Sequence, residues 1–488
     1  MHERSRPAFG RLRDRSPVHG LDRRNLGPLG VLAQSVSGAA PAAAMAATPV
    51  IVAATAGPAT IWSFVVATVL ALLIGACIGQ FTRRMAAAGG LYSLTAKGLG
   101  SGPAFICGAA LLVGYGMLAM AALTGAAMFL GALLGRVGLN VSVPGPVLAG
   151  GVVALVASTW AFVLLGVRLS ARVVLLVEAV SITLMLVIFS VLLGADTVPP
   201  AAAVPEPAPG LGGIAAGVLP ALAAFIGFEA ATALGVEARR PFRTIPRAVQ
   251  WTAAVSGLLY LFAAQTQVVG FAHTTGGLAA QAEPVITLAA AQGQPWVSVV
   301  LDIGITMSFF ACTLATVNAL VRVLFSMGRD GIAPTVLGAT HRRYRTPHRA
   351  IAVALPVVAA VPAGLLAAGV APARTLTALL TLATCGYLVA YLLVALAAPV
   401  FLHRIGELTW PPVAVTAVLA PVLVVVLVAF VLTTGGGPLP IVLAVLGLLT
   451  AGWFGWLRVW RPEQLAGIGV YDETCAADVL GEPIRIQL

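Results

Sequence analysis

The chain alternates between long apolar runs and short stretches that carry polar residues and arginines. An apolar run of about 20 residues is long enough to cross a bilayer as a helix. Such runs occupy roughly residues 28–53, 59–81, 103–134, 146–166, 172–194, 211–235, 248–271, 296–327, 350–370, 375–400, 411–434 and 438–459. The pattern therefore predicts an all-α membrane protein with twelve transmembrane helices.

The first and the sixth apolar runs are interrupted by residues that weaken a helix. The first contains Gln34–Pro41, with the sequence QSVSGAAP, and the sixth contains Phe225–Glu229, with the sequence FIGFE. Glycine adds backbone freedom, proline removes a hydrogen-bond donor, and a glutamate at membrane depth is ionisable. Because the interruptions occupy corresponding positions in two halves of the chain, they predict two broken helices that face each other, the arrangement around a transporter's binding site.

Composition and charge agree with this class of protein. Hydrophobic residues make up 59% of the chain and charged residues 9%, against about 25% charged in soluble domains. The formal net charge of +11 does not predict a nucleic-acid partner, because the cations cluster at alternate ends of the apolar runs. The intervening loops contain only Arg136 and Arg374 as cations. By the positive-inside rule we expect a multi-pass protein of the cell membrane, embedded in the lipid bilayer, with both termini cytoplasmic.

The polar termini frame the predicted bundle. We expect a basic cytoplasmic arm at residues 1–25, a transporter core at 26–400, two further spans at 401–460 and a cytoplasmic tail at 461–488. Residues Leu21 to Leu26 of the arm are basic and amphipathic, and we expect them to lie on anionic lipid.

Motifs for catalysis are missing from the sequence. There is no HExxH, no GxSxG, no P-loop and no His–Asp pairing within the predicted spans, so we predict neither an enzyme nor a bound cofactor. Five cysteines lack paired spacing, and we interpret them as small apolar residues and not as metal ligands: Cys77, Cys107, Cys312, Cys385 and Cys475.

Three stretches resemble the amino acid–polyamine–organocation (APC) superfamily of permeases. They are Arg83–Ser93, with its Gly-Gly-Leu-Tyr, Ala224–Ala248, which joins the sixth run to a basic loop, and Asn318–His348, which contains Gly-Arg-Asp-Gly and Arg-Thr-Pro-His. The resemblance extends from about residue 28 to about residue 400. It implies the leucine-transporter-like fold, in which spans one to five and six to ten form inverted repeats and two more spans are appended.

The same resemblance implies a function. It is typical of a secondary active transporter that moves amino acids or related amines by alternating access, coupled to protons or working as an exchanger. The alternative is a permease-like sensor or assembly partner that has lost transport.

Broken helices can bind both charges of an amino acid through their main chain. We expect the substrate carboxylate at N–H groups near Ser37, Gly38 and Ala39, and the ammonium at carbonyls near Phe225, Ile226 and Gly227. Members of the superfamily often have Gly-x-Gly at the first break, where this chain has Ser-Gly-Ala-Ala-Pro. The alternative interpretation is that the glycines only allow helices to pack closely.

Aromatic and acidic side chains complete the predicted site. Phe225 and Phe228 are expected to close over the substrate, with Tyr115 and Tyr387 as pocket walls, or else to serve packing. Glu229 is expected to act as a proton-linked gate or an amine contact, or else to cap a helix end.

Glu178 in the fifth span has two interpretations, a structural ion pair near the interface and a part in proton coupling. A sodium site is the less favoured expectation, with hydroxyls and an amide from the eighth span: Ser308, Thr313, Thr316 and Asn318.

Overall fold

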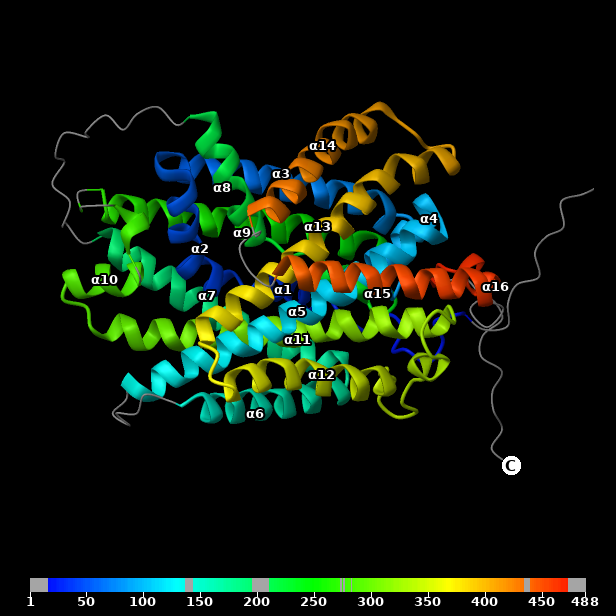
Figure 1. Ribbon diagram of the computed structural model, residues 1–488, viewed down its shortest axis with the longest axis horizontal. Coiled ribbons are helices and arrows are strands. Elements are labelled where there is room, and N and C mark those ends of the chain that lie inside the picture. Colours follow the sequence, from blue (N-terminus) through cyan, green and yellow to red (C-terminus); the bar gives the residue numbers. More distant parts are fainter. Residues whose placement is uncertain are drawn as a thin grey trace, which may run out of the picture.

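The computed structural model describes residues 16–136, 144–194, 210–272, 274, 277–281, 283–433 and 439–472. These residues form a helical bundle (Figure 1). Its longer helices are α1 (Pro28–Gly38), α2 (Pro41–Ala56), α3 (Thr60–Thr82), α5 (Ser101–Leu134), α6 (Gly145–Leu164), α7 (Val167–Gly194), α8 (Leu211–Ala223), α9 (Pro241–Gly270), α11 (Trp296–Arg329), α12 (His348–Ala367), α13 (Pro372–Arg404), α14 (Trp410–Thr433) and α15 (Leu439–Trp460). Shorter helices are α4 (Leu91–Leu99), α10 (Pro284–Ala291) and α16 (Pro462–Ala466).

Each predicted apolar run has a helical counterpart. Among the described residues, ten helical stretches are long and apolar enough to cross a membrane. The first of them, Pro28–Thr82, contains the first two predicted runs, and the sixth predicted run begins as the shorter apolar helix α8. The prediction of an all-α membrane protein is confirmed, whereas the number of twelve crossings stays a prediction.

The first predicted break lies between α1 and α2. Helix α1 ends at Gly38, and α2 begins at Pro41. Between them Ala40 has left-handed backbone angles, φ 45° and ψ 57°, which an L-residue with a Cβ adopts only at a cost. Pro41 has no N–H and cannot continue α1, but it is well suited to the first position of α2. The chain therefore stops one helix and starts another inside a single apolar run.

The second predicted break follows α8. Helix α8 ends at Ala223, turns occupy residues 224–229, and the 3-10 helix η3 (Ala230–Leu234) precedes α9. Gly227 has a φ of 90°, a conformation that glycine adopts without a steric penalty. Both interruptions read from the sequence are thus confirmed as breaks in the helices.

Two long helices, α5 and α11, form the centre of the bundle, where α5 packs against α11 and α13. Helices α6 and α12 pair along one side of it, while α3 pairs with α9 (Figure 1). Both halves of the first span contact α9 and α11. The two breaks are therefore surrounded by α9, α11 and η3, away from the lipid-facing surface.

One end of the bundle carries most of the described arginines, including Arg83, Arg243, Arg329 and Arg349, and is called the basic end below. Helices α4 and α16 both lie at this end, at the right of Figure 1. The expectation that Leu21 to Leu26 lie on lipid is wrong. Leu21 and Leu26 are only 3% and 4% exposed, and Leu26 pairs with Ala238 in a parallel β-bridge, because the apolar side chains find buried protein partners. Residues 1–15 of the predicted arm and 473–488 of the predicted tail lie outside the described residues.

Candidate functional site

The two helix breaks cross each other in direct backbone contact. A Cβ built on Gly38 would lie 2.2 Å from the Gly227 carbonyl oxygen, and one built on Gly227 would lie 2.3 Å from the Gly38 carbonyl oxygen. No real side chain fits at such distances, so both positions require glycine. The predicted facing of the two breaks is confirmed. The two glycines allow this close packing, and their part in substrate binding stays a prediction.

The first break leaves main-chain N–H groups unpaired. They lie about one helical turn after Ser37, Gly38 and Ala39, where they were expected. The N–H of Ala39 donates to the Val36 carbonyl at 3.1 Å, which closes the end of α1. Pro41 has no N–H, and the N–H groups of Ala42 and Ala43 make no hydrogen bond to any described residue. The positive end of α2 therefore presents two free donors at this depth.

The second break leaves a main-chain acceptor unpaired. The carbonyl of Phe225 accepts from the N–H of Phe228 at 3.2 Å, and that of Gly227 accepts from Ala230 at 3.0 Å. Between them the Ile226 carbonyl accepts no hydrogen bond from any residue that the structure describes. Free N–H groups at one break and a free carbonyl at the other match the two charges of a zwitterion.

Side chains from neighbouring helices tie the breaks together. The Ser35 hydroxyl donates to the Phe228 carbonyl. The Tyr260 hydroxyl from α9 donates to the Ala224 carbonyl at 2.8 Å and lies 3.5 Å from the Ala39 carbonyl oxygen. The Cys312 thiol of α11 lies 3.4 Å from the Gly38 carbonyl oxygen. These contacts fix the two interrupted segments against α9 and α11.

Glu229 is fully buried between two tyrosines. Tyr115 of α5 donates to its Oε1 at 2.9 Å, and Tyr391 of α13 donates to its Oε2. The Tyr391 hydroxyl in turn accepts from the N–H of Gly227 at 3.3 Å. The carboxylate makes no capping hydrogen bond to η3. It does interact with the backbone N–H groups of Gly227 and of Glu229 itself at the break, so the gate and the cap both stay predictions for this residue. The carboxylate is thus linked to the main chain of the second break.

Glu178 lies at the other side of the first break, and its interpretation as a structural ion pair is wrong. Its Oε1 accepts from the Ser308 hydroxyl of α11 at 3.2 Å, and no described cation pairs with it. Its Oε2 and the hydroxyl of Ser37 in α1 lack a hydrogen bond of full geometry, although the hydroxyl lies close enough to interact with the carboxyl group. The carboxyl group faces α1 because the fifth span turns this residue into the bundle and not toward the arginines at the interface.

The polar residues considered for sodium mostly bond within the protein. The hydroxyls of Thr313 and Thr316 donate to carbonyls of their own helix, at 3.0 Å and 2.7 Å. The Asn318 amide donates to the Ser170 hydroxyl at 2.8 Å. Among the described residues, no group of three or more His, Cys, Asp and Glu side chains could hold a metal ion.

The predicted aromatic residues gather at the second break. The Phe225 ring packs edge-on against Tyr260 at 5.0 Å between centroids, and the Tyr115 ring packs against Tyr387 at 5.3 Å. Sequence reasoning missed Tyr391 and Tyr260. A signal for Tyr391 was present, since it lies four residues after Tyr387 and therefore on the same helix face.

Known proteins resemble this chain in sequence and in fold. The family described as "Amino acid permease" matches residues 26–453. The branched-chain amino acid permease BcaP of Bacillus subtilis is 28% identical over 310 residues, which cover 61% of this chain and 65% of the relative, just under two thirds of its length. The methylthioribose transporter of the same species is 26% identical over 366 residues, covering 72% of this chain and 76% of the relative.

A solved structure shares the fold. A mutant of the manganese transporter of Eremococcus coleocola superposes with a TM-score of 0.54 at 14% identity, covering 90% of this chain and 94% of that one. At this identity the match supports the leucine-transporter-like fold and nothing finer. The family match spans most of the chain, including both helix breaks, and these relatives are transporters and not enzymes. The chain therefore belongs to the amino acid permease family of the APC superfamily.

Proposed function

We propose that this permease is a secondary active transporter of amino acids or related amines that works by alternating access. Its substrate site is the crossing of the two helix breaks, lined by Ser37, Gly38 and Ala39 on one side and by residues 225–228 on the other. It operates in the cell membrane, with both termini on the cytoplasmic side.

The observation that carries the proposal is the pairing of unsatisfied main-chain groups. The free N–H groups of Ala42 and Ala43 bind the substrate carboxylate, and the free Ile226 carbonyl binds the ammonium. Main-chain groups unpaired inside a bundle carry a desolvation cost, which a ligand of matching charge removes. The phenyl rings of Phe225 and Phe228 supply apolar surface for the rest of the substrate.

The name of one relative supports this substrate class, and the name of the other does not. BcaP is named as a branched-chain amino acid permease, and a second relative as a methylthioribose transporter. The site of this chain is mainly apolar around the backbone groups, which suits a solute with an apolar side chain. We therefore expect uncharged amino acids with apolar side chains among the substrates.

Coupling to protons is assigned to Glu229 and Glu178. Glu229 contacts the second break through Tyr391, and Glu178 faces Ser37 of the first break with one oxygen that lacks a hydrogen bond of full geometry. A buried carboxyl without a cation is favoured in its neutral form, so gain or loss of a proton changes how each break is held. In transport, the segments α1–α3, α8 and α9 rock against the remaining helices around the fixed site.

Counterflow in proteoliposomes tests the proposal. Liposomes with purified protein are loaded with unlabelled amino acid, and entry of the labelled amino acid is followed for a panel of amino acids and polyamines, with and without sodium and pH gradients. We expect saturable exchange of at least one amino acid, with a proton gradient and not a sodium gradient driving accumulation. Binding by thermal shift without any flux would instead favour the sensor function.

The glutamate assignment is tested in the same liposomes with Glu229→Gln and Glu178→Gln. Each variant should change the pH dependence of uptake. The matched control is Glu407→Gln, which removes an exposed carboxylate that pairs with Arg84 at 2.7 Å, remote from the breaks. Equal pH profiles in all variants would remove both glutamates from the mechanism.

A further inference from the structure

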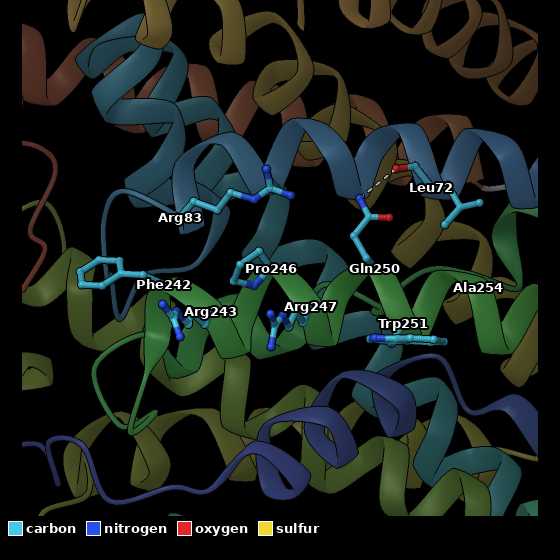
Figure 2. Close-up of a pocket in the computed structure, with 9 residues that line it drawn as sticks. All are labelled: Leu72, Arg83, Phe242, Arg243, Pro246, Arg247, Gln250, Trp251 and Ala254. Atoms are coloured by element: carbon cyan, nitrogen blue, oxygen red, sulfur yellow. Dashed lines mark hydrogen bonds between the residues drawn. The ribbon is translucent and has the colours of Figure 1, made fainter. Parts of the chain in front are cut away.

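A groove with three arginines opens between α3 and α9 at the basic end. It encloses about 590 Å³ and is lined by Leu72, Arg83, Phe242, Arg243, Pro246, Arg247, Gln250, Trp251 and Ala254 (Figure 2). Arg83 comes from the end of α3, while Arg243 and Arg247 come from the first turns of α9. The Gln250 amide donates to the Leu72 carbonyl at 3.3 Å and so ties the two helices across the groove.

The positive charge of this groove is not neutralised by the protein. The side chains of Arg83, Arg243 and Arg247 make no ion pair or hydrogen bond with any described residue, and no described acidic residue lines the groove. A second cavity of about 410 Å³ shares Phe242 and Arg243 with it and adds Arg24, Arg239 and Arg240. Six arginines thus line the two cavities, and one of them, Arg24, is paired with Asp472.

Along the groove the lining changes from charged to apolar. Trp251 is 62% exposed and Phe242 46% exposed, although both are large apolar side chains. Trp251 lies one turn deeper along α9 than Arg247, with Ala254 beyond it and Leu72 of α3 opposite. Tryptophan at such a level is typical of the membrane–water interface.

We propose that this groove binds the headgroup of an anionic phospholipid in the leaflet at the basic end. The guanidinium groups of Arg243, Arg247 and Arg83 bind the phosphate, since arginine binds phosphate oxygens in a fork, and the acyl chain lies over Trp251 and Ala254. A soluble phosphate ester would share the first contact but not the second. This site is separate from the proposed substrate site and does not depend on it.

Native mass spectrometry of the full chain in detergent tests the inference, with phosphatidylglycerol and phosphatidylcholine added in turn. We expect wild-type protein to retain phosphatidylglycerol preferentially, and the double variant Arg243→Gln/Arg247→Gln to bind it at least about tenfold more weakly. Arg247→Gln alone should weaken phosphatidylglycerol binding by about three- to fivefold. This single variant replaces the double variant in the test if the double variant does not fold.

The matched control is Arg342→Gln/Arg349→Gln, which removes the same charge from exposed positions at the same end. Unchanged phosphatidylglycerol binding in the groove variant, or an equal loss in the control, would overturn the proposal. So would displacement of the lipid by soluble glycerol phosphate, which would make the groove a site for free phosphate esters.

A second inference rests on the segment after α16, residues 467–472, called the clasp below. The Asp330 carboxylate accepts from the N–H groups of Gly469 and Val470, at 3.1 Å and 3.2 Å. The Asp472 carboxylate then pairs with Arg23 at 2.9 Å and Arg24 at 2.7 Å. The clasp therefore joins the end of α11 to the segment that enters the first span.

The chain on both sides of these pairs is held by main-chain bonds. The Asp472 N–H donates to the Ala86 carbonyl at 2.8 Å, in the loop between α3 and α4. The Arg24 N–H donates to the Val236 carbonyl at 3.1 Å, just after the second break. Movement of α1 at the basic end therefore breaks the contacts of Asp472 with the arginines.

We infer that the clasp is an autoinhibitory contact that holds the basic end closed and releases before α1 moves. This inference rests on the proposed alternating access. The test variant is Asp472→Asn, which keeps the shape and removes the charge, and the control is Glu463→Gln in the exposed first turn of α16.

Two readouts separate this inference from the proposed function. Hydrogen–deuterium exchange of the amides of Arg24 to Leu26 should become several-fold faster in Asp472→Asn and stay unchanged in the control, and the initial rate of counterflow should rise about twofold or more. Unchanged amide exchange overturns the clasp. Faster amide exchange with an unchanged counterflow rate overturns its inhibitory role. Absence of flux in the wild-type protein refutes the proposed function and the inhibitory role of the clasp. The amide exchange still tests in that case whether Asp472 holds the segment Arg24 to Leu26.

Discussion

The crossing of the two breaks makes a sharp steric prediction for Gly38→Ala. The added Cβ would lie 2.2 Å from the Gly227 carbonyl oxygen, where ordinary contact begins at 3.4 Å. The Gly227 oxygen is a backbone atom, and the added Cβ is bonded directly to the backbone, so neither can turn away. The two segments must therefore separate by about 1.2 Å, the difference between these distances. Overpacking of a buried contact costs about 1–3 kcal/mol, with larger values where backbone has to move.

The displacement matters more for function than for folding. A shift of about 1 Å moves the free Ile226 carbonyl away from the donors at the start of α2, and misplacement of this size in a binding site reduces rates by about a hundredfold. Counterflow per molecule should fall by about that factor. The melting temperature in detergent should fall by a few degrees, since the bundle as a whole is retained.

A matched control is available in α3. Gly79 is also buried in a helix, but a Cβ there would meet no atom within 4 Å. Gly79→Ala should keep transport and gain up to about 1 kcal/mol of stability from helix propensity. If Gly38→Ala transported at the wild-type rate with an unchanged melting temperature, the crossing of the breaks would not be the substrate site.

Three further predictions follow from buried polar contacts. Tyr391→Phe should lower counterflow strongly, because it removes two hydrogen bonds at the second break, whereas Tyr387→Phe should have little effect, because the Tyr387 hydroxyl is buried without a partner. Glu237→Gln should lower stability by about 3–5 kcal/mol in thermal unfolding, since it leaves the buried Arg322 without its partner at 2.8 Å. Burial raises the pKa of Asp330 from 3.8 to about 6. The folded protein therefore binds this proton more tightly than the unfolded chain does, and the stability gained in this way is lost as the pH rises through about 6. The melting temperature of Asp330→Asn minus that of wild type should therefore be more positive at pH 7.5 than at pH 5, and a difference independent of pH would contradict this.

The carboxyl group of Asp330 has few charged neighbours. Tyr92 of α4 donates to Asp330 at 2.6 Å, Lys97 of the same helix is the nearby cation, and the clasp contributes main-chain N–H groups. The Tyr92 bond and the two N–H groups favour the charged form, but burial outweighs them. The difference between 3.8 and about 6 corresponds to at most about 3 kcal/mol.

The sequence was most informative about where helices could not continue. Pro41 cannot extend α1, and Gly227 adopts a φ of 90°, so both breaks were readable from local chemistry. The position of the free donors was not, because whether Ala39 closes α1 depends on how its N–H finds the Val36 carbonyl. Whether the Ala39 N–H is paired or free depends on the backbone conformation of a single turn, which residue type alone does not determine.

Partners across the bundle were harder to predict than breaks. Glu178 was placed near arginines by its spacing, but the rotation of the fifth span turns it toward Ser308. Leu21 and Leu26 are equally suited to a lipid surface and to a protein interior, and the pairing with Ala238 decides between them. Such contacts join residues distant in sequence, and a single sequence contains no signal for the rotation of one helix against another.

Protection of Cys312 by substrate tests the central claim most directly. Its thiol lies 3.4 Å from the Gly38 carbonyl oxygen, and replacing Cys77, Cys107, Cys385 and Cys475 by alanine leaves it as the single thiol. The rate of its modification by a small thiol reagent is measured with and without an amino acid that the protein exchanges. The account predicts that the amino acid slows modification several-fold, with half-protection near the concentration that half-saturates transport. Modification at the same rate with a saturating transported amino acid would contradict the placement of the substrate between the two breaks.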